Sequence, residues 1–489
     1  MKTYKITEGV KTLRYPKYLH RQNETIVNWG KEIGAYSPVT NEICLLDSTE
    51  RKILQSLYLS SAKTIDGISK STNLPLATVR RLVTNLVRHQ LIVDPNLEKE
   101  VVIEYNTTTA QLYVKLTEGC NFACPGCVTA SDKIPPNQAK ILDQDTLQIY
   151  LESFLRSADE KQIKSVKIKW AGGEPLLPIS YKLIVASQPY LQKLIKKYPK
   201  ISLEQVILTN GVFINHQSTL FAKKHHIRFS ISLWGTKKIQ DQERRPRNHQ
   251  ESYSKIIENI CLLENVGTGY SLNHVITPSN AKHFANFINS MWNTNHSSFI
   301  GKQSDINHPI PLYIAFYRPQ SFYQQDILTK QYCLMEQGLR SGFSEIKKMI
   351  NLGIEIQPLN RIDYLNLSGM TPAACGSGYN YVAVGPKGAV SCHEELLDMK
   401  DNLDKIIKGV NIFDLVNQDQ LLERSLYLGT NIKFEQYKYI GLHGGQGCPR
   451  MRKIENKGDL SISGSVTKFY LSILNELLSL ECLQQIRFK

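Results

Sequence analysis

Residues 120–127 read CNFACPGC and place three cysteines within eight positions of a 489-residue chain that has ten in all. Cys120, Cys124 and Cys127 follow the spacing CxxxCxxC. A disulfide needs two thiols, and a structural zinc site usually needs a fourth Cys or His close by, which this loop lacks. Three thiolates at this spacing can hold three irons of a 4Fe–4S cluster and leave the fourth iron open. The stretch therefore predicts an iron–sulfur cluster, with a zinc knuckle as the simpler alternative.

The composition describes an ordinary globular protein, with 42% hydrophobic and 21% charged residues. The N-terminal stretch MKTYKITEGVKTLRYP lacks the apolar region of a signal peptide, and no apolar run approaches the roughly 18 residues that span a bilayer. We therefore expect a cytoplasmic protein without membrane contact, where clustered cysteines more often bind metal than form disulfides. The formal net charge of +15 suits a soluble basic surface or an acidic partner, which would be a nucleic acid or an acidic peptide.

Residues 1–23 form a polar, basic arm, and residues 24–105 show the pattern of a winged-helix domain. Three strand-like runs, TIVNWG, KEIGAYSP and NEICLLD, precede a helix that begins near Asp47 or Ser48. A helix, a turn with Pro75 and a longer helix follow. We expect the apolar side chains of the last helix to face inward, namely Val79, Leu82, Val83, Leu86 and Val87.

Residues 110–325 alternate short strand-like runs with amphipathic helices. This alternation predicts an α/β fold with a parallel sheet, and six such units suit a partial (β/α)6 TIM-like barrel with its active site at the C-terminal strand ends. The strand candidates are 112–117, 166–172, 205–211, 227–235, 270–277 and 311–317. Beyond them the alternation breaks down. Residues 326–489 are expected to form a smaller C-terminal domain with a Gly-rich hairpin, GYNYVAVGPKGAVSCHE, and a C-terminal helix.

Between residues 110 and 320 the sequence resembles the radical SAM superfamily, whose hallmark is CxxxCxxC after the first strand of a partial barrel. Further motifs follow in the family's order, each at the end of a later strand. These are Gly172, Gly173, Glu174 and Pro175 in WAGGEPLL, Thr209, Asn210 and Gly211 in LTNG, Ser232 in SISLWG, and Arg245 in QDQERRPRN. Arg244 and Arg247 are neighbours that could replace Arg245. The sequence departs from the family in having LWG for LDG, and Gly126 where an aromatic residue is usual.

The resemblance implies S-adenosylmethionine as cofactor on the cluster of Cys120, Cys124 and Cys127. A backbone edge of the GGEP motif and the Glu174 carboxylate would bind the methionine ammonium, which glycines and a carboxylate suit physically. Ser232 would contact the cofactor, and Arg245 would neutralise its carboxylate. The reduced cluster would cleave the cofactor to methionine and a 5′-deoxyadenosyl radical, which abstracts a substrate hydrogen atom.

The C-terminal cysteines resemble those of SPASM/twitch-type auxiliary cluster domains. Cys375 and Cys392 bracket the hairpin, and Cys448 lies in HGGQGCPRM. The resemblance implies that these three hold one auxiliary 4Fe–4S cluster, because the cysteines for a second cluster are absent. Candidates for the fourth ligand are Cys333, His443 and Cys482, and an iron left open for substrate is an equal alternative.

The N-terminal domain has two interpretations. A winged helix in a basic protein favours DNA binding through the helix 78–89, with Arg80, Arg81 and Arg88 on phosphates. The preceding strands and SPVTNEICLLDSTERKIL instead resemble the RiPP recognition element, a PqqD-like winged helix that captures the leader of a ribosomally made precursor peptide. Leaders of this kind add a strand to an exposed sheet edge. We favour the peptide, because the basic surplus suits an acidic leader, and consider nucleic acid an unlikely partner.

These observations predict a radical SAM enzyme that modifies a ribosomal precursor peptide bound through its leader and takes electrons from a flavodoxin or ferredoxin type of donor. An auxiliary cluster favours oxidative C–C or C–S crosslinking. Cα epimerisation is an alternative, and it needs a hydrogen donor, for which Cys333 and Cys482 are candidates. Backbone excision (splicing) is a further one. An iron–sulfur regulator that binds DNA is an alternative of another class.

Overall fold

The structure is a computed structural model, and it describes most of the first two thirds of the chain together with parts of the remainder. The described residues are 3–6, 11–12, 33–37, 42–58, 63–89, 91–93, 108–125, 127, 129–292, 312–316, 325–351, 361–362, 380–393, 396 and 401–416.

A nine-stranded sheet forms the centre of the larger part, in the order β13-β12-β11-β10-β9-β8-β7-β14-β15. All six strands expected for the barrel are present and pair in parallel with their neighbours, so the predicted parallel sheet is confirmed. Their bounds are β7 Thr109–Lys115, β8 Ser165–Ala171, β9 Ser202–Thr209, β10 Ile227–Ser232, β11 Tyr270–Ile276 and β12 Leu312–Phe316.

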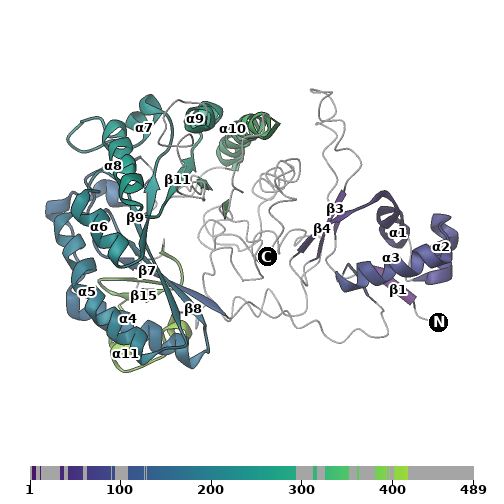
Figure 1. The fold of residues 1–489 in the computed structure, drawn as a ribbon, viewed down its shortest axis with the longest axis horizontal. Coiled ribbons are helices and arrows are strands. Elements are labelled where there is room, and N and C mark those ends of the chain that lie inside the picture. The colour runs from purple at the N-terminus through teal and green to yellow at the C-terminus, as the bar shows by residue number, and fades with distance from the viewer. Residues whose placement is uncertain are drawn as a thin grey trace.

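Helices follow these strands and cover the outside of the sheet, as Figure 1 shows for α4, α5, α6 and α8. Alternate strand residues such as Leu112, Ile168 and Leu272 are fully buried against them, because successive side chains point to opposite faces of a strand. The residues between them face the inner side of the sheet. The helices are α4 Gln144–Glu160, α5 Pro178–Lys197, α6 His216–Lys224, α7 Lys237–Glu243, α8 Tyr253–Val266 and α9 Phe284–Trp292, with three short 3-10 turns, Ser131–Lys133, Pro136–Gln138 and Ala281–His283.

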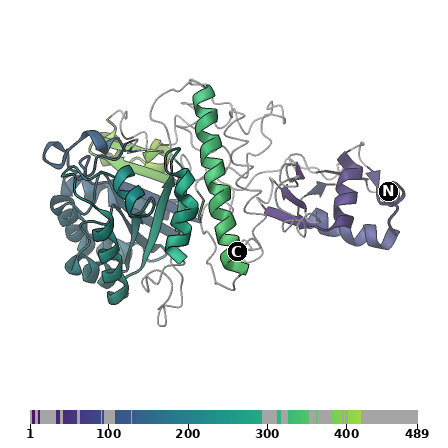
Figure 2. The same cartoon turned by 90° about the horizontal axis from the view of Figure 1, so that it is seen from above.

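The helix that follows β12 begins at residue 325, where the sequence suggested the end of the barrel. Helix α10, Gln325–Asn351, stands beside α9 in Figure 2 and buries Met335, Leu339 and Phe343 in the barrel core. The strand β13, Arg361–Ile362, then pairs in parallel with β12. The alternation of strand and helix therefore continues beyond the last strand that the sequence indicated. The sequence did not indicate this because α10 is long and the strand after it, β13, has only two residues.

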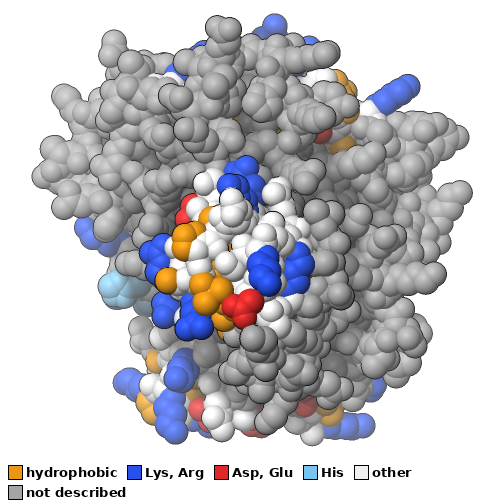
Figure 3. Space-filling model, turned by 90° about the vertical axis from the view of Figure 1, so that its right-hand side faces the viewer, with side chains coloured by type: hydrophobic (Ala, Val, Ile, Leu, Met, Phe, Trp, Pro, Cys, Tyr) orange, Lys and Arg blue, Asp and Glu red, His pale blue; other side chains and the backbone are white. Residues whose placement is uncertain are grey.

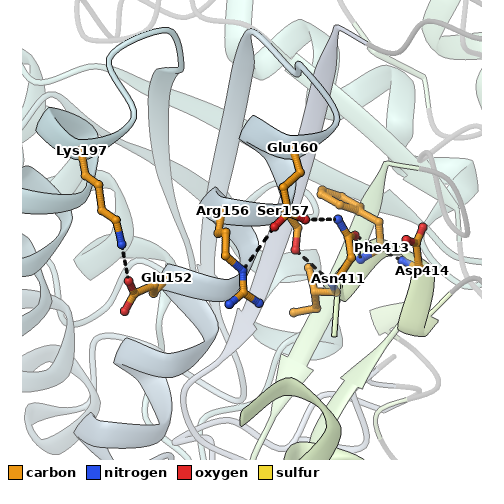
Figure 4. A network of polar contacts seen from close by, with 9 residues as sticks. Glu152, Arg156, Ser157, Glu160, Lys197, Asn411, Phe413 and Asp414 are labelled. Atoms are coloured by element: carbon orange, nitrogen blue, oxygen red, sulfur yellow. Dashed lines mark hydrogen bonds and ion pairs between the residues drawn. The ribbon is translucent and has the colours of Figure 1, made fainter. Parts of the chain in front are cut away.

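The Gly-rich hairpin is present as β14, Tyr381–Gly385, and β15, Gly388–Val390, but it joins the barrel sheet. Strand β14 pairs in parallel with β7, the strand that precedes the cysteines. Helix α11, Leu403–Ile407, and the residues after it pack on α4. There the Ser157 hydroxyl accepts a hydrogen bond from the backbone N–H of Ile412 at 3.0 Å, within the polar network of Figure 4. The described part of the C-terminal region is thus continuous with the first βα unit.

The N-terminal elements have a hydrophobic core of their own. Their bounds are β1 Thr3–Ile6, β2 Lys11–Thr12, β3 Ile33–Ser37, β4 Glu42–Leu46, α1 Ser48–Tyr58, β5 Lys63–Thr64, α2 Ile65–Thr72, α3 Leu76–Arg88 and β6 Ile92–Val93. They form two three-stranded sheets, β5-β1-β6 and β2-β3-β4. Two stretches of the expected N-terminal arm are therefore strands, because β1 finds backbone partners in β5 and β6, far along the chain. The run TIVNWG lies outside the described residues.

The helices of this part agree closely with their sequence signals. Asp47 is the cap of α1, since its carboxylate accepts hydrogen bonds from the N–H groups of Thr49 and Glu50, both at 2.7 Å. The Glu50 carboxylate in turn accepts a hydrogen bond from the Asp47 N–H at 3.1 Å, which completes a capping box. Four of the five expected apolar residues of α3 are buried, and Val87 packs against them. Within the part of the chain that the structure describes, no helix is long and apolar enough to cross a membrane.

Candidate active site

The three cysteines of the opening motif lie on the loop that leaves the C-terminal end of β7. Cys120 and Cys124 are buried, and Cys127 is more exposed. The loop is held by backbone hydrogen bonds, from the Cys120 N–H to the Ile134 carbonyl at 3.2 Å and from the Ala123 N–H to the Arg245 carbonyl at 2.7 Å. These contacts fix the thiols at the edge of the sheet where a barrel has its active site.

Arg247 holds both ends of this loop. Its Nε donates to the carbonyl of Cys120 at 2.8 Å, and its Nη2 donates to the carbonyls of Ser131 at 3.1 Å and Asp132 at 2.6 Å. Its backbone N–H also donates to the Asn121 carbonyl at 2.8 Å. Arg247 thus binds the backbone of the cysteine loop through its Nε, its Nη2 and its main-chain N–H.

The two glycines of GGEP bring the end of β8 against the start of the cysteine loop. Gly172 has φ +143°, and a Cβ on it would lie 2.5 Å from the Thr117 carbonyl oxygen. A Cβ on Gly173 would overlap the Gly119 carbonyl. The Glu174 N–H donates to that same carbonyl at 3.0 Å. The close backbone approach expected of these glycines is thus an approach to the cysteine loop.

Glu174 connects the GGEP motif with the end of β9. One carboxylate oxygen accepts hydrogen bonds from the Thr209 hydroxyl at 2.7 Å and the Leu176 N–H at 2.9 Å, and the other accepts from the Asn210 N–H at 2.8 Å. Burial raises the pKa of the Glu174 carboxyl, and these hydrogen bonds act in the opposite direction. Because a carboxylate offers about four lone-pair sites, one remains for a further donor such as an ammonium group.

Asn210 continues this connection to the cysteines. Its side-chain Nδ2 donates to Oδ1 of Asn121 at 2.8 Å and lies 4.0 Å from Sγ of Cys120. The structure thus brings Cys120, Glu174, Thr209 and Asn210, which are widely separated in the sequence, into one hydrogen-bonded group at the ends of β7, β8 and β9.

Ser232 ends β10 and lies in register beside Asn273 of β11. Asn273 alternates with the buried core residues Leu272 and His274 and so faces the inner side of the sheet with Ser232. Its Oδ1 is buried and has no hydrogen-bond partner among the described residues. Asn273 was not singled out from the sequence, although its polar side chain in the alternating run YSLNHVIT was an available signal.

Of the three clustered arginines, Arg244 has its side chain directed toward Phe122 of the cysteine loop. Its guanidinium carbon lies 4.7 Å from the centre of the Trp234 ring and 5.7 Å from that of Phe122. Its Nε is buried and unpartnered within the described part of the chain. Its charge lowers the pKa of both Cys124 and Glu174 against the larger effect of burial. Arg245, the sequence-based choice, is exposed, and its Nε donates to the Gln242 carbonyl at 3.0 Å. Arg244 is thus buried beside Phe122 and Trp234, whereas Arg245 faces outward, so the contact of Arg245 with the cofactor carboxylate stays a prediction.

Further residues that the sequence did not single out complete the surroundings. Lys115 ends β7 and is 2% exposed, and burial lowers the pKa of its ammonium group. The indole N–H of Trp234 is buried without a described partner. An unpaired N–H of this kind beside Arg244 suits an acceptor group that enters the site.

The structure describes only part of the expected auxiliary site. Cys392 is buried two residues after the end of β15, and its neighbour His393 stacks on Tyr113 with ring centres 4.9 Å apart. The other two expected ligands, Cys375 and Cys448, lie outside the described residues, as do His443 and Cys482. Cys333 is exposed on α10, where the Gln337 amide donates to its sulfur at 3.8 Å. An exposed position suits neither a hydrogen donor inside the barrel nor a ligand of a buried cluster.

The cysteine loop supplies three thiols at the spacing that a 4Fe–4S cluster can use. Among the described residues no three His, Cys, Asp or Glu side chains gather closely enough to hold one ion. In a 4Fe–4S cluster each cysteine binds a different iron, so the three sulfurs need not converge on one point. Burial raises the pKa of the Cys120 and Cys124 thiols. These thiols would lose their protons only when metal binds, which is how metal binding couples to thiol ionisation.

Comparisons with known proteins agree with this arrangement. No family model matches the chain. It is 25% identical over 175 residues to a serine-type anaerobic sulfatase-maturating enzyme of Bacteroides thetaiotaomicron, which is 35% of this chain and 40% of that relative. It is 28% identical over 171 residues to a cysteine-type anaerobic sulfatase-maturating enzyme of Clostridium novyi, or 34% and 43% of the two chains. The match thus spans less than half the length of these relatives.

The fold has a close likeness among solved structures. The structure of native anSMEcpe with bound AdoMet superposes with a TM-score of 0.56 at 16% identity and covers 77% of this chain and 98% of that one. The same protein has also been solved with AdoMet and the Cp18Cys peptide. This chain shares that fold.

Proposed function

We propose that this chain is a radical SAM enzyme that modifies a ribosomally synthesised precursor peptide, most consistently by oxidative C–C or C–S crosslinking. The observation that carries the proposal is the hydrogen-bonded group of Cys120, Glu174, Thr209 and Asn210 at the ends of three neighbouring strands. A tight turn or a chance cysteine cluster would not require these motifs to meet. The likeness to sulfatase-maturating enzymes over a third of the chain supports the same chemistry.

The residues of the site divide the work of holding the cofactor. Cys120, Cys124 and Cys127 would bind three irons of the cluster. The remaining lone pair of Glu174, with the backbone of Gly172 and Gly173, would receive the methionine ammonium. The reduced cluster and bound S-adenosylmethionine together supply a 5′-deoxyadenosyl radical, which takes a hydrogen atom from the substrate.

The opposite side of the site would hold the rest of S-adenosylmethionine. Arg244 would pair with its carboxylate, since the guanidinium is buried and keeps one N–H free of any described partner. Ser232 and Asn273 present a hydroxyl and an amide oxygen on the inner face of the sheet, where both can orient the ribose or the substrate. The aromatic rings of Trp234 and Phe122 exclude water from the guanidinium and so strengthen its ion pair.

A peptide substrate is supported by anSMEcpe, which has been solved with a bound peptide, and by the N-terminal elements. The two-residue strand β2 lies at one edge of the sheet β2-β3-β4, a position that suits strand addition by a leader. Cys375, Cys392 and Cys448 would hold the auxiliary cluster that takes the second electron, and a flavodoxin or ferredoxin type of protein would supply the first. The exposed position of Cys333 disfavours it as the hydrogen donor of an epimerase.

The proposal is tested by anaerobic co-expression with the precursor peptide encoded beside the gene, followed by high-resolution mass spectrometry. Wild type is compared with Cys120→Ala/Cys124→Ala/Cys127→Ala. We expect 5′-deoxyadenosine to form, and the peptide to lose two hydrogens, in wild type alone. An unchanged peptide mass together with deuterium uptake from heavy water would replace crosslinking by epimerisation. Absence of 5′-deoxyadenosine from reconstituted wild type would overturn the radical mechanism.

A further inference from the structure

We propose that Thr129, directed by Ser131, donates a hydrogen bond to the Cys127 sulfur and thereby raises the reduction potential of the cluster that Cys127 binds. The inference rests on the proposed function, because it needs that cluster, and it assigns a tuning role to two residues that lie outside the sequence motifs quoted above.

The two hydroxyls form a short chain that ends on the sulfur. The Thr129 hydroxyl oxygen lies 3.3 Å from Sγ of Cys127, and the Ser131 hydroxyl lies 3.0 Å from the Thr129 oxygen. Thr129 is 8% exposed and Ser131 is fully buried. Water therefore competes little for either hydroxyl, and the hydrogen bonds are stronger than they would be at the surface.

Binding of iron fixes the direction of this chain. A free thiol could donate to Thr129 or accept from it. A thiolate on iron has no proton and can only accept. For both contacts to remain hydrogen bonds, Thr129 donates its single hydroxyl proton to sulfur, and its oxygen accepts the proton of Ser131. Both hydroxyls are satisfied in only this one orientation once the cluster is present.

The backbone holds the two hydroxyls in line. Ala130, between them, has a left-handed conformation with φ 51° and ψ 22°, which costs energy for a residue with a Cβ. Its N–H donates to the Cys127 carbonyl at 2.9 Å, and Arg247 binds the Ser131 carbonyl at 3.1 Å. These contacts keep the turn in place, so the hydroxyls are positioned before the cluster is reduced.

The effect on the potential follows from charge. Reduction adds one negative charge, which spreads over the cluster sulfurs and makes them better acceptors. A donor to sulfur therefore stabilises the reduced state more than the oxidised state and raises the potential, since hydrogen bonds to the sulfurs are one of the factors that set it. Removal of the donor makes reduction harder.

The test is an EPR-monitored redox titration of the anaerobically reconstituted full-length protein. The signal of this cluster is the one that changes when S-adenosylmethionine is added. Thr129→Val keeps the shape of the side chain and removes the hydroxyl. We expect it to lower the reduction equilibrium constant about tenfold, which for one electron is 59 mV. Thr129→Ser restores the donor and the wild-type potential, and Ser131→Ala shifts it the same way by less.

The matched control is Thr268→Val, a buried threonine whose hydroxyl donates to the Thr219 carbonyl at 3.2 Å, far along the chain from the cysteines. It should leave the potential unchanged. Equal potentials in wild type and Thr129→Val, or an equal shift in the control, would overturn the inference alone. If Thr129→Val cannot hold a cluster, the reduction potential of Ser131→Ala decides the question. A Ser131→Ala potential equal to that of wild type would contradict the inference. A wild-type chain that binds no 4Fe–4S cluster overturns the proposed function together with this inference.

Discussion

Arg244 and Arg245 are neighbours in the sequence but have opposite environments, and this difference can be measured. Arg244→Gln should weaken the binding of S-adenosylmethionine about 10- to 100-fold, because a charge-assisted hydrogen bond contributes roughly 1.5–3 kcal/mol and each 1.4 kcal/mol is tenfold in affinity. Arg245→Gln should bind it as wild type does, since the Arg245 side chain is exposed. Isothermal titration with the unreactive analogue S-adenosylhomocysteine measures both without turnover.

A reversed result, with Arg245→Gln as the weak binder, would return the carboxylate contact to the arginine that the sequence suggested. Circular dichroism of both variants controls for folding. The two substitutions are chemically identical and adjacent. If binding depended only on net charge, both would weaken it equally, so the same experiment distinguishes a general charge effect from a specific contact of Arg244.

His274 is expected to make the stability of the barrel depend on pH. It is fully buried, its Nδ1 lies 3.1 Å from the Leu233 carbonyl, and its ring stacks on Phe287 with centres 4.4 Å apart. Burial lowers the pKa of His274 to about 3. In the unfolded chain the His274 imidazole therefore binds a proton near pH 6.5, whereas in the folded chain it stays neutral at that pH. Stability should therefore fall by about 1.4 kcal/mol per pH unit as the pH drops below 6.5.

His274→Asn isolates this contribution, because Asn carries its amide nitrogen near the position of Nδ1 and does not titrate. The free energy of unfolding in urea, measured from pH 7.5 down to 4.5, should fall less steeply for the variant than for wild type. Parallel curves of unfolding free energy against pH for wild type and variant would show that His274 binds its proton equally well in the folded and the unfolded chain.

At the scale of elements, the attachment of residues 411–414 to α4 offers a contrast between buried and exposed contacts (Figure 4). The Ser157 hydroxyl is fully buried and accepts the Ile412 N–H at 3.0 Å. Ser157→Ala leaves that N–H without its partner and should cost about 1–3 kcal/mol. The ion pair of Lys161 with Asp414 at 2.7 Å is largely exposed, so Lys161→Ala should cost at most about 1 kcal/mol.

Urea unfolding compares the two variants, and limited proteolysis reports whether the C-terminal segment detaches first. Equal losses of stability would show that the buried contact is worth no more than the exposed one. Earlier cleavage of Lys161→Ala than of Ser157→Ala would show that the ion pair contributes more than the Ser157 hydrogen bond to holding residues 411–414 on α4.

The elements also show which features the sequence could predict. The six barrel strands and the cap at Asp47 depend on local patterns and are confirmed. The pairing of β14 with β7 and of β1 with β5 and β6 joins segments far apart in the chain, and no local pattern encodes such partners. The sequence leaves Arg244 and Arg245 unseparated for a related reason, since the side that a residue faces at a helix end depends on its packing, here against Trp234 and Phe122.

At the scale of the whole molecule, one basic surface lies on helix α3 of the N-terminal elements. Helix α3 carries no acidic residue and exposes Arg80, Arg81 and Arg88. In the coloured area at the centre of Figure 3, Lys and Arg side chains lie around a small apolar area, with few acidic side chains among them. A surface of this kind attracts an acidic partner and makes its binding depend on salt.

On the proposed function, Arg80→Glu/Arg81→Glu should therefore weaken the binding of a precursor leader at least tenfold and flatten its dependence on salt, without a change in the cleavage of S-adenosylmethionine. Fluorescence anisotropy of the labelled leader, measured between low and physiological salt, reports both effects. The control is Lys193→Glu/Lys196→Glu, which makes the same change of charge at exposed positions of α5 and should leave leader binding intact. A labelled DNA duplex serves as the second probe. Tighter and sequence-dependent binding of the duplex, lost in the α3 variant, would replace the peptide by nucleic acid as the partner of this helix. Equal losses in both charge variants would assign the attraction to net charge rather than to α3.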